Sequence, residues 1–120
     1  MIKVDETTRV VRETTAPYEY SDGGEIKTDE IRVRYRSPTW NELQHDQEEL
    51  AALAKTNPDA PYWPHQAMAK LIVELPDLSG PDGKPFAITA ENLGHISPVN
   101  LTAMRKAIDA DIQGKAQPEK

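Results

Sequence analysis

One stretch decides the fold: Ile31-Arg-Val-Arg-Tyr-Arg-Ser-Pro-Thr-Trp-Asn-Glu-Leu43. Its apolar residues first alternate with arginines, which is the period-two pattern of a strand with one buried face. A proline turn then ends the strand, and Thr39 with Glu42 has the spacing of a capping box that opens a helix. A strand that passes into a helix through such a turn indicates structure and carries no catalytic signature.

The composition predicts a small core. The chain has 120 residues, of which Leu, Ile, Val and Phe account for only 23, close to the composition of disordered proteins. We therefore expect one domain over residues 17–113 that gains stability from self-association or from a partner. Residues 1–16 are expected to form a flexible lead-in or a weak edge strand, and residues 114–120 a disordered tail.

The charge and the missing residue types exclude several classes of function. A net charge of −6 makes the chain a poor ligand for nucleic acid or for an anionic membrane, since both require clustered cations. The absence of cysteine excludes disulfides, zinc–thiolate sites and thiol nucleophiles. No signal peptide is visible, and no apolar run approaches the roughly 20 residues of a membrane helix. We expect a soluble cytoplasmic protein.

The first part of the chain predicts a β-hairpin or small meander over residues 16–36. The turn is expected around Ser21-Asp-Gly-Gly24, because glycine adopts positive φ without strain. The apolar residue expected to face the core is even-numbered at Ile26 but odd-numbered at Ile31. A bulge or a second turn is therefore expected at residues 28–30.

The remainder predicts helices, which gives an α+β fold with three to four helices after the hairpin. Each expected helix has a capping residue or a proline at a boundary. Their ranges are about 39–55, 64–75, 89–93 and 97–113. The proline-rich segment 58–64 between the first two is expected to be a semi-rigid loop.

The residues of catalytic chemistry occur in no arrangement that supports an active site. His45, His65 and His95 match no short metal-ligand spacing. The turn at residues 80–84 has neither the spacing of a phosphate-binding loop nor the acidic positions of a calcium loop. We predict no catalytic, cofactor-binding or metal-binding residues, and therefore no enzyme.

A row of arginines, Arg32, Arg34 and Arg36, is the one local concentration of charge. The expected explanation is the solvent-facing side of the hairpin, with the arginines paired to Glu19, Glu25 or similar cross-strand acids. The functional alternative is an electrostatic docking surface for an acidic partner.

Two apolar stripes are candidates for binding a partner protein. The first lies on the helix over residues 39–55 and is interrupted by Asp46 and Gln47, as expected of an incompletely buried face. Its residues are Trp40, Leu43, Leu50 and Leu53. The alternative surface lies on the last helix and consists of Leu101, Met104 and Ile108.

The order of motifs resembles the tail assembly chaperones of long-tailed bacteriophages and prophages. The motifs are Ser37-Pro-Thr-Trp-Asn-Glu-Leu43, the apolar segment Met68–Leu75, the turn Asp82-Gly-Lys-Pro85 and the segment Ile88-Thr-Ala-Glu-Asn-Leu93. The resemblance covers roughly residues 20–113. It rests on the order and spacing of structural motifs.

The resemblance implies a non-enzymatic protein of virion assembly in the cytoplasm of the bacterial host. Such a chaperone binds the tape measure protein and keeps it soluble until tail-tube subunits polymerise around it. The tail-tube protein and a second copy of this chain are further candidate partners. Two other functions stay open: a small structural tail or connector component of the virion, and an acidic inhibitor that mimics a nucleic-acid surface.

Overall fold

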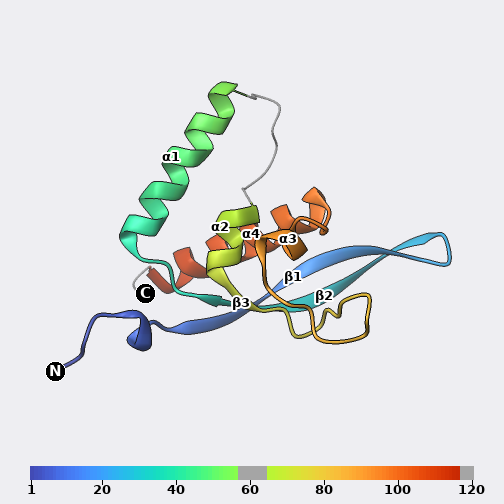
Figure 1. The fold of residues 1–120 in the computed structure, drawn as a ribbon, viewed down its shortest axis with the longest axis horizontal. Helices are drawn as coiled ribbons and strands as arrows, with labels where there is room; N and C mark the ends of the chain where they lie inside the picture. Colours follow the sequence, from blue (N-terminus) through green and yellow to red (C-terminus); the bar gives the residue numbers. More distant parts are fainter. Residues whose placement is uncertain (57–64, 117–120) are drawn as a thin grey trace.

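The computed structural model describes residues 1–56 and 65–116, without the side chains of residues 50, 53, 54, 56, 65–67, 115 and 116. The predicted α+β class is confirmed: a three-stranded antiparallel sheet is combined with helices that follow the hairpin (Figure 1). The elements in chain order are the 3₁₀ turn η1 (Glu6–Thr8), β1 (Val11–Asp22), β2 (Glu25–Arg36), α1 (Trp40–Thr56), α2 (His65–Leu71), β3 (Ile72–Glu74), α3 (Ala90–Leu93) and α4 (Pro98–Ala116). The predicted loop at residues 58–64 lies outside the described residues.

Strands β1 and β2 form the predicted hairpin, which is longer than expected. Their register is unbroken along β1 from Val11 to Asp22. Gly23 and Gly24 form the turn with φ of 61° and 87°, and two positive φ values are what a two-residue type I′ turn requires. Because β1 is an edge strand, it matches the strand alternative for the second part of residues 1–16.

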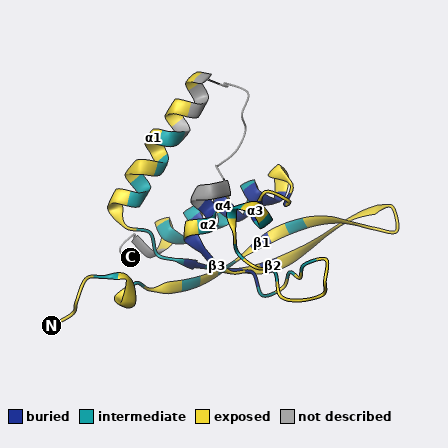
Figure 2. Ribbon diagram, viewed as in Figure 1, coloured by how far each residue is buried: buried dark blue, intermediate teal, exposed yellow. Residues whose placement is uncertain are grey.

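The bulge or second turn predicted at residues 28–30 is wrong, because β2 pairs with β1 in one register throughout. The prediction assumed that Ile26 faces the core. Ile26 instead shares the arginine face of β2 and is 77% exposed. The tip of the hairpin extends beyond the helices, and residues 20–30 are all exposed (Figure 2). A side chain in this arm has no core to face. The alternation of apolar and polar residues therefore does not predict which side of the strand is buried there.

The helix predicted over residues 64–75 is also partly wrong. Helix α2 ends at Leu71, and Ile72–Glu74 form strand β3, which pairs with the second edge of β2. Two neighbouring β-branched residues, Ile72 and Val73, favour an extended backbone. The pairing also buries Ile72, which is 2% exposed. Residues 68–75 are therefore apolar because the end of α2 and strand β3 both pack against the core.

The core lies between one face of the sheet and helices α2, α3 and α4 (Figure 2). Tyr35 ties the two layers together, because its fully buried ring bears a hydroxyl that donates to a carboxylate oxygen of Asp111 on α4. Burial and this hydrogen bond both raise the pKa of Tyr35. The buried apolar residues are Ala16, Ile31, Val33, Tyr35, Met68, Leu71, Ile72, Leu75, Leu93, Ile96, Leu101, Met104 and Ile108.

Asn100 of α4 closes part of the outer edge of β1. Its Oδ1 accepts from the backbone N–H of Glu19 at 2.8 Å, and its Nδ2 donates to the carbonyl of the same residue at 2.9 Å. This amide therefore pairs with both backbone groups of Glu19, as a neighbouring strand would. Pro17, on the same edge, has no N–H that needs a partner. Asn100 thereby links α4 to one backbone position of β1, in addition to the contact between Asp111 and Tyr35.

The predicted helix caps are confirmed at both later helices. The N–H of Asn92 donates to Oγ1 of Thr89 at 3.0 Å, and the N–H of Asn100 donates to Oγ of Ser97 at 3.4 Å. Helix α4 continues through Gly114 to Ala116, so its predicted end at residue 113 is too early. Residues 117–120 of the predicted tail lie outside the described residues. No helix in residues 1–56 or 65–116 has both the length and the apolar character to cross a membrane.

We expect Asn100→Ala to lower the free energy of unfolding by about 1–3 kcal/mol, because it removes two part-buried hydrogen bonds to the backbone of Glu19. Urea denaturation followed by circular dichroism measures the change. Asn41→Ala, at an exposed position of α1, is the control and should cost less than about 0.5 kcal/mol. Equal stabilities of the two variants would show that Asn100 does not anchor α4.

Candidate functional site

The arginines of β2 form ion pairs on the solvent-facing side of the sheet. Arg32 Nη2 lies 2.8 Å from Oδ1 of Asp77, whose other oxygen accepts from the Arg32 backbone N–H at 2.7 Å. Arg34 lies between two acids, with Nε 2.9 Å from Glu13 and Nη1 3.3 Å from Glu74. The hydrogen bonds from Arg32 lower the pKa of Asp77. These two arginines are therefore neutralised within the sheet and its flanking turn.

The third arginine of the row, Arg36, donates from Nη1 to the carbonyl of Lys70 at 3.2 Å. The acids that pair with this face come from β1, β3 and the turn after β3. The prediction of cross-strand acids is confirmed for Glu13, which lies opposite Arg34. Glu19 and Glu25 lie opposite Thr28 and Asp22 instead. Cross-strand neighbours of β3 could not be anticipated while that segment was expected to be helical. The arrangement gives little support to a docking surface for an acidic partner, because Arg32 and Arg34 are already paired with acids and Arg36 is bonded to a backbone carbonyl.

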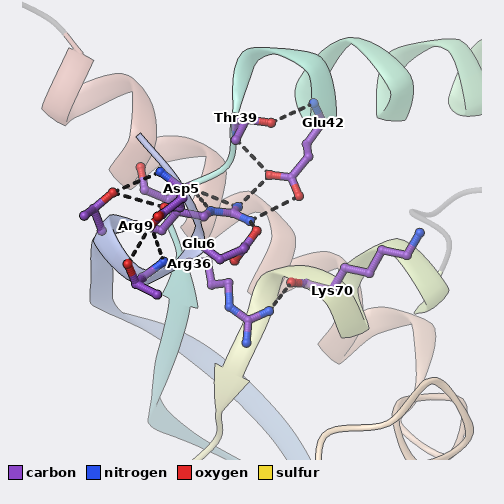
Figure 3. A network of polar contacts seen from close by, with 10 residues as sticks. Asp5, Glu6, Arg9, Arg36, Thr39, Glu42 and Lys70 are labelled. Atoms are coloured by element: carbon purple, nitrogen blue, oxygen red, sulfur yellow. Dashed lines mark hydrogen bonds and ion pairs between the residues drawn. The ribbon is translucent and has the colours of Figure 1, made fainter. Parts of the chain in front are cut away.

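A network at the start of α1 fixes the strand-to-helix junction (Figure 3). Arg9, before β1, is its centre: Nη2 donates to the carbonyl of Ser37 at 3.0 Å and lies 2.6 Å from Oε1 of Glu42. Nη1 of the same guanidinium lies 2.7 Å from Glu6. The segment before the sheet is thereby tied to both sides of the turn at Pro38. We call Arg9, Ser37, Thr39 and Glu42 the junction network.

The capping box inside this network is the one predicted from sequence. The N–H of Thr39 donates to Oε1 of Glu42 at 2.8 Å, and the N–H of Glu42 donates to Oγ1 of Thr39 at 3.2 Å. Burial alone would raise the pKa of Glu42, but the hydrogen bond from Thr39 and the charge of Arg9 lower it. The ionised carboxylate therefore caps the helix and holds Arg9 at the same time.

Beyond the junction, α1 extends away from the sheet (Figures 1 and 2). None of its described side chains is buried. Trp40, the first residue of the predicted stripe, is 79% exposed, and Leu43 is half-buried. The side chains of Leu50 and Leu53 lie outside the described residues. Among the described positions, the predicted incomplete burial of this stripe agrees with the structure.

A groove of about 520 Å³ separates the first half of α1 from the second half of α4. Each helix contributes one face over two turns. We call it the α1/α4 groove, and its lining residues are Trp40, Leu43, Gln44, Asp46, Gln47, Arg105, Asp109, Ile112 and Gln113. Apolar side chains thus lie next to amides and carboxylates in a space open to solvent.

Asp46, one of the two polar residues that break the stripe, contacts α4. Its Oδ2 lies 3.9 Å from Nη1 of Arg105, and Nε of Arg105 lies 3.0 Å from Oδ1 of Asp109. Arg105 is 8% exposed. The interruption of the stripe therefore marks the point at which α1 contacts the body through charge in place of apolar packing.

This contact is electrostatically costly. Burial raises the pKa of Asp46 although Arg105 opposes the change. Burial also lowers the pKa of Arg105 despite its two carboxylate neighbours. At 3.9 Å the attraction between Asp46 and Arg105 is too weak to offset their loss of hydration. The pair therefore orients α1 toward α4 without stabilising the fold.

The alternative surface on the last helix is not available to a partner in this fold. Leu101, Met104 and Ile108 are exposed by 2%, 0% and 0%, respectively, because they face the sheet. The apolar periodicity that suggested them is that of a core helix. They are therefore not carried into the candidate site.

The histidines do not meet in the described structure. His45 lies 2.9 Å from Glu49 one turn later on α1, His95 is exposed after α3, and the side chain of His65 lies outside the described residues. Within the described residues, no group of three or more His, Cys, Asp or Glu side chains is suited to hold a metal ion.

Sequence reasoning does not identify Arg9, Arg105 or Asp109. Arg9 and Glu42 are 33 residues apart, so no local spacing relates them. Arg105 and Asp109 have the i,i+4 spacing of a helical ion pair, which is a usable signal once the last helix is predicted. It gives no indication that Arg105 is buried against α1.

Asp46→Asn should raise the free energy of unfolding at pH 7. The folded-state pKa of Asp46 lies above the ordinary value of 3.8, so the ionised group destabilises the fold at neutral pH. This cost decreases as the pH falls through the folded-state pKa and disappears below the unfolded-state one. The gain from the substitution should therefore shrink between pH 7 and about pH 4, as measured by urea denaturation.

Glu48→Gln makes the same change of charge at an exposed position of the same helix and should alter the stability by less than about 0.5 kcal/mol. A loss of stability in Asp46→Asn at pH 7 would show that the attraction of Arg105 exceeds the cost of burial.

Comparison of the chain with protein-family models, with curated proteins and with solved structures found no match. The resemblance to phage tail assembly chaperones is therefore one of sequence motifs and their order. The groove and the exposed helix are considered below on their own geometry.

Proposed function

We propose that the chain is a non-enzymatic phage tail assembly chaperone that acts in the cytoplasm of the bacterial host. It binds the tape measure protein and keeps apolar helical segments of that protein in solution while the tail tube assembles. The observation that carries the proposal is α1, a helix of 17 residues with no buried side chain among those described. Most helices depend on packing for their stability, so a helix held away from the core suits a protein that completes its packing with a partner.

The surface chemistry supports the same function. A carrier of an apolar segment needs apolar contact area for binding and a charged exterior that keeps the complex dispersed. Trp40 and Leu43 provide contact area at the α1/α4 groove. The net charge of −6 provides the second property.

The alternative, a small structural tail or connector component, is supported by a different feature. The tip of the β1–β2 hairpin extends past the helices with Ile26 exposed, and an isolated two-stranded arm is only marginally stable alone. Such an arm could pack against neighbouring subunits in a particle. Mass spectrometry of purified virions separates the two functions, since a chaperone is absent from the finished particle.

Co-expression with the tape measure protein of the same phage tests the proposal. We expect the tape measure protein to move from the insoluble to the soluble fraction and to co-elute with this chain in size-exclusion chromatography. The matched control is expression of the tape measure protein with an unrelated acidic protein of similar size. Recovery of insoluble tape measure protein with and without this chain would contradict the function.

A further inference from the structure

We propose that the α1/α4 groove binds an amphipathic helix that carries lysine or arginine residues beside its apolar stripe. The inference deepens the proposed function, on which it rests, by assigning the binding site and the chemistry of the segment bound. It is carried by the shape of the groove, by its apolar residues and by its charge.

The shape of the groove matches a helix. On α1 the lining residues Trp40, Leu43, Gln44 and Gln47 have the spacing i, i+3, i+4, i+7, which is one complete face over two turns. On α4 the lining residues Arg105, Asp109, Ile112 and Gln113 have the spacing i, i+4, i+7, i+8. A space lined by the faces of two helices is the kind of site into which a third helix packs.

The apolar side chains provide the anchoring contacts. Trp40 is 79% exposed at one end of the α1 face, Leu43 is half-buried, and Ile112 lines the same groove from α4. Tryptophan is among the residues that contribute most to protein interfaces when they become buried. Glutamine amides along both helices supply adaptable hydrogen-bonding groups at the rim.

The charge of the groove selects a basic partner. Its lining contains two carboxylates, Asp46 and Asp109, and one cation, Arg105, which contacts both. One guanidinium balances only one of the two carboxylates, so the lining keeps a net negative charge. Helix α1 as a whole carries four carboxylates and one lysine. A second copy of α1 would bring like charges together, whereas a basic helix would place its cations near the carboxylates. The same acidity opposes binding of nucleic acid.

The chain contains its own reporter for this site. Trp40 and Trp63 are its two tryptophans, so Trp63→Phe leaves fluorescence from Trp40 alone. The probes are two synthetic helical peptides with the same leucine stripe, one flanked by lysines and the other by glutamates. We expect the lysine peptide to shift the Trp40 emission to shorter wavelength and to bind at least about tenfold more tightly than the glutamate peptide at low salt, because several rim ion pairs add up.

Salt and matched variants locate the binding site. The preference for the lysine peptide should decrease in about 1 M salt, where the Debye length falls to roughly 3 Å. Gln47→Lys, an exposed substitution in the groove, should weaken the lysine peptide without unfolding the chain. Val99→Asp is the control, because Val99 is 59% exposed in a separate apolar hollow on α4 and should leave binding unchanged.

Equal affinities for the two peptides, an unshifted Trp40 emission, or loss of binding in Val99→Asp alone would each overturn the assignment. The co-expression assay distinguishes this failure from failure of the function. If Gln47→Lys solubilises the tape measure protein as well as the native chain does, the groove is wrong and the chaperone function stands. If the lysine peptide binds as expected but the tape measure protein stays insoluble, the groove stands and the function is wrong.

Discussion

The position of α1 depends on one shared contact, the carboxylate of Glu42 between the guanidinium of Arg9 and the N–H of Thr39. A helix normally gains its orientation from an apolar face pressed against the core. Here the described side chains of α1 are all exposed or half-buried, so the direction of the helix is set mainly where it begins. Arg9 strengthens this contact because it also binds the carbonyl of Ser37, on the other side of the proline turn.

The exposure of α1 follows from this constraint, and so does the chemistry of the groove beside it. A helix fixed at one end leaves its apolar residues available, and across the gap between α1 and α4 Asp46 contacts Arg105 through charge in place of apolar packing. The gap is bounded by two helical faces, and its lining carries two carboxylates and one guanidinium. The same features that make this part of the fold weak make it suitable for a basic amphipathic helix.

Local signals in the sequence predicted the local structure well, and the failures occurred where distant residues decide. The capping box of Thr39 and Glu42 and the glycine turn of the hairpin depend on neighbouring residues, and both are confirmed. Ile72 was expected in a helix because its periodicity is helical, but pairing with β2 is a tertiary interaction that periodicity does not encode. The candidate stripe beginning at Trp40 was found from spacing alone. Its partner residue Arg105 was not, since the contact of Asp46 with α4 depends on how the helices pack.

Amide hydrogen exchange along α1 tests most directly the claim that the helix is held at its first turn. In the native chain, α1 should be protected less than β2 and α4, because fewer of its side chains are buried. In Arg9→Met the protection of α1 should fall further, while that of β2 and α4 stays the same. Protection of α1 equal to that of α4, or unchanged protection of α1 in Arg9→Met, would contradict the account.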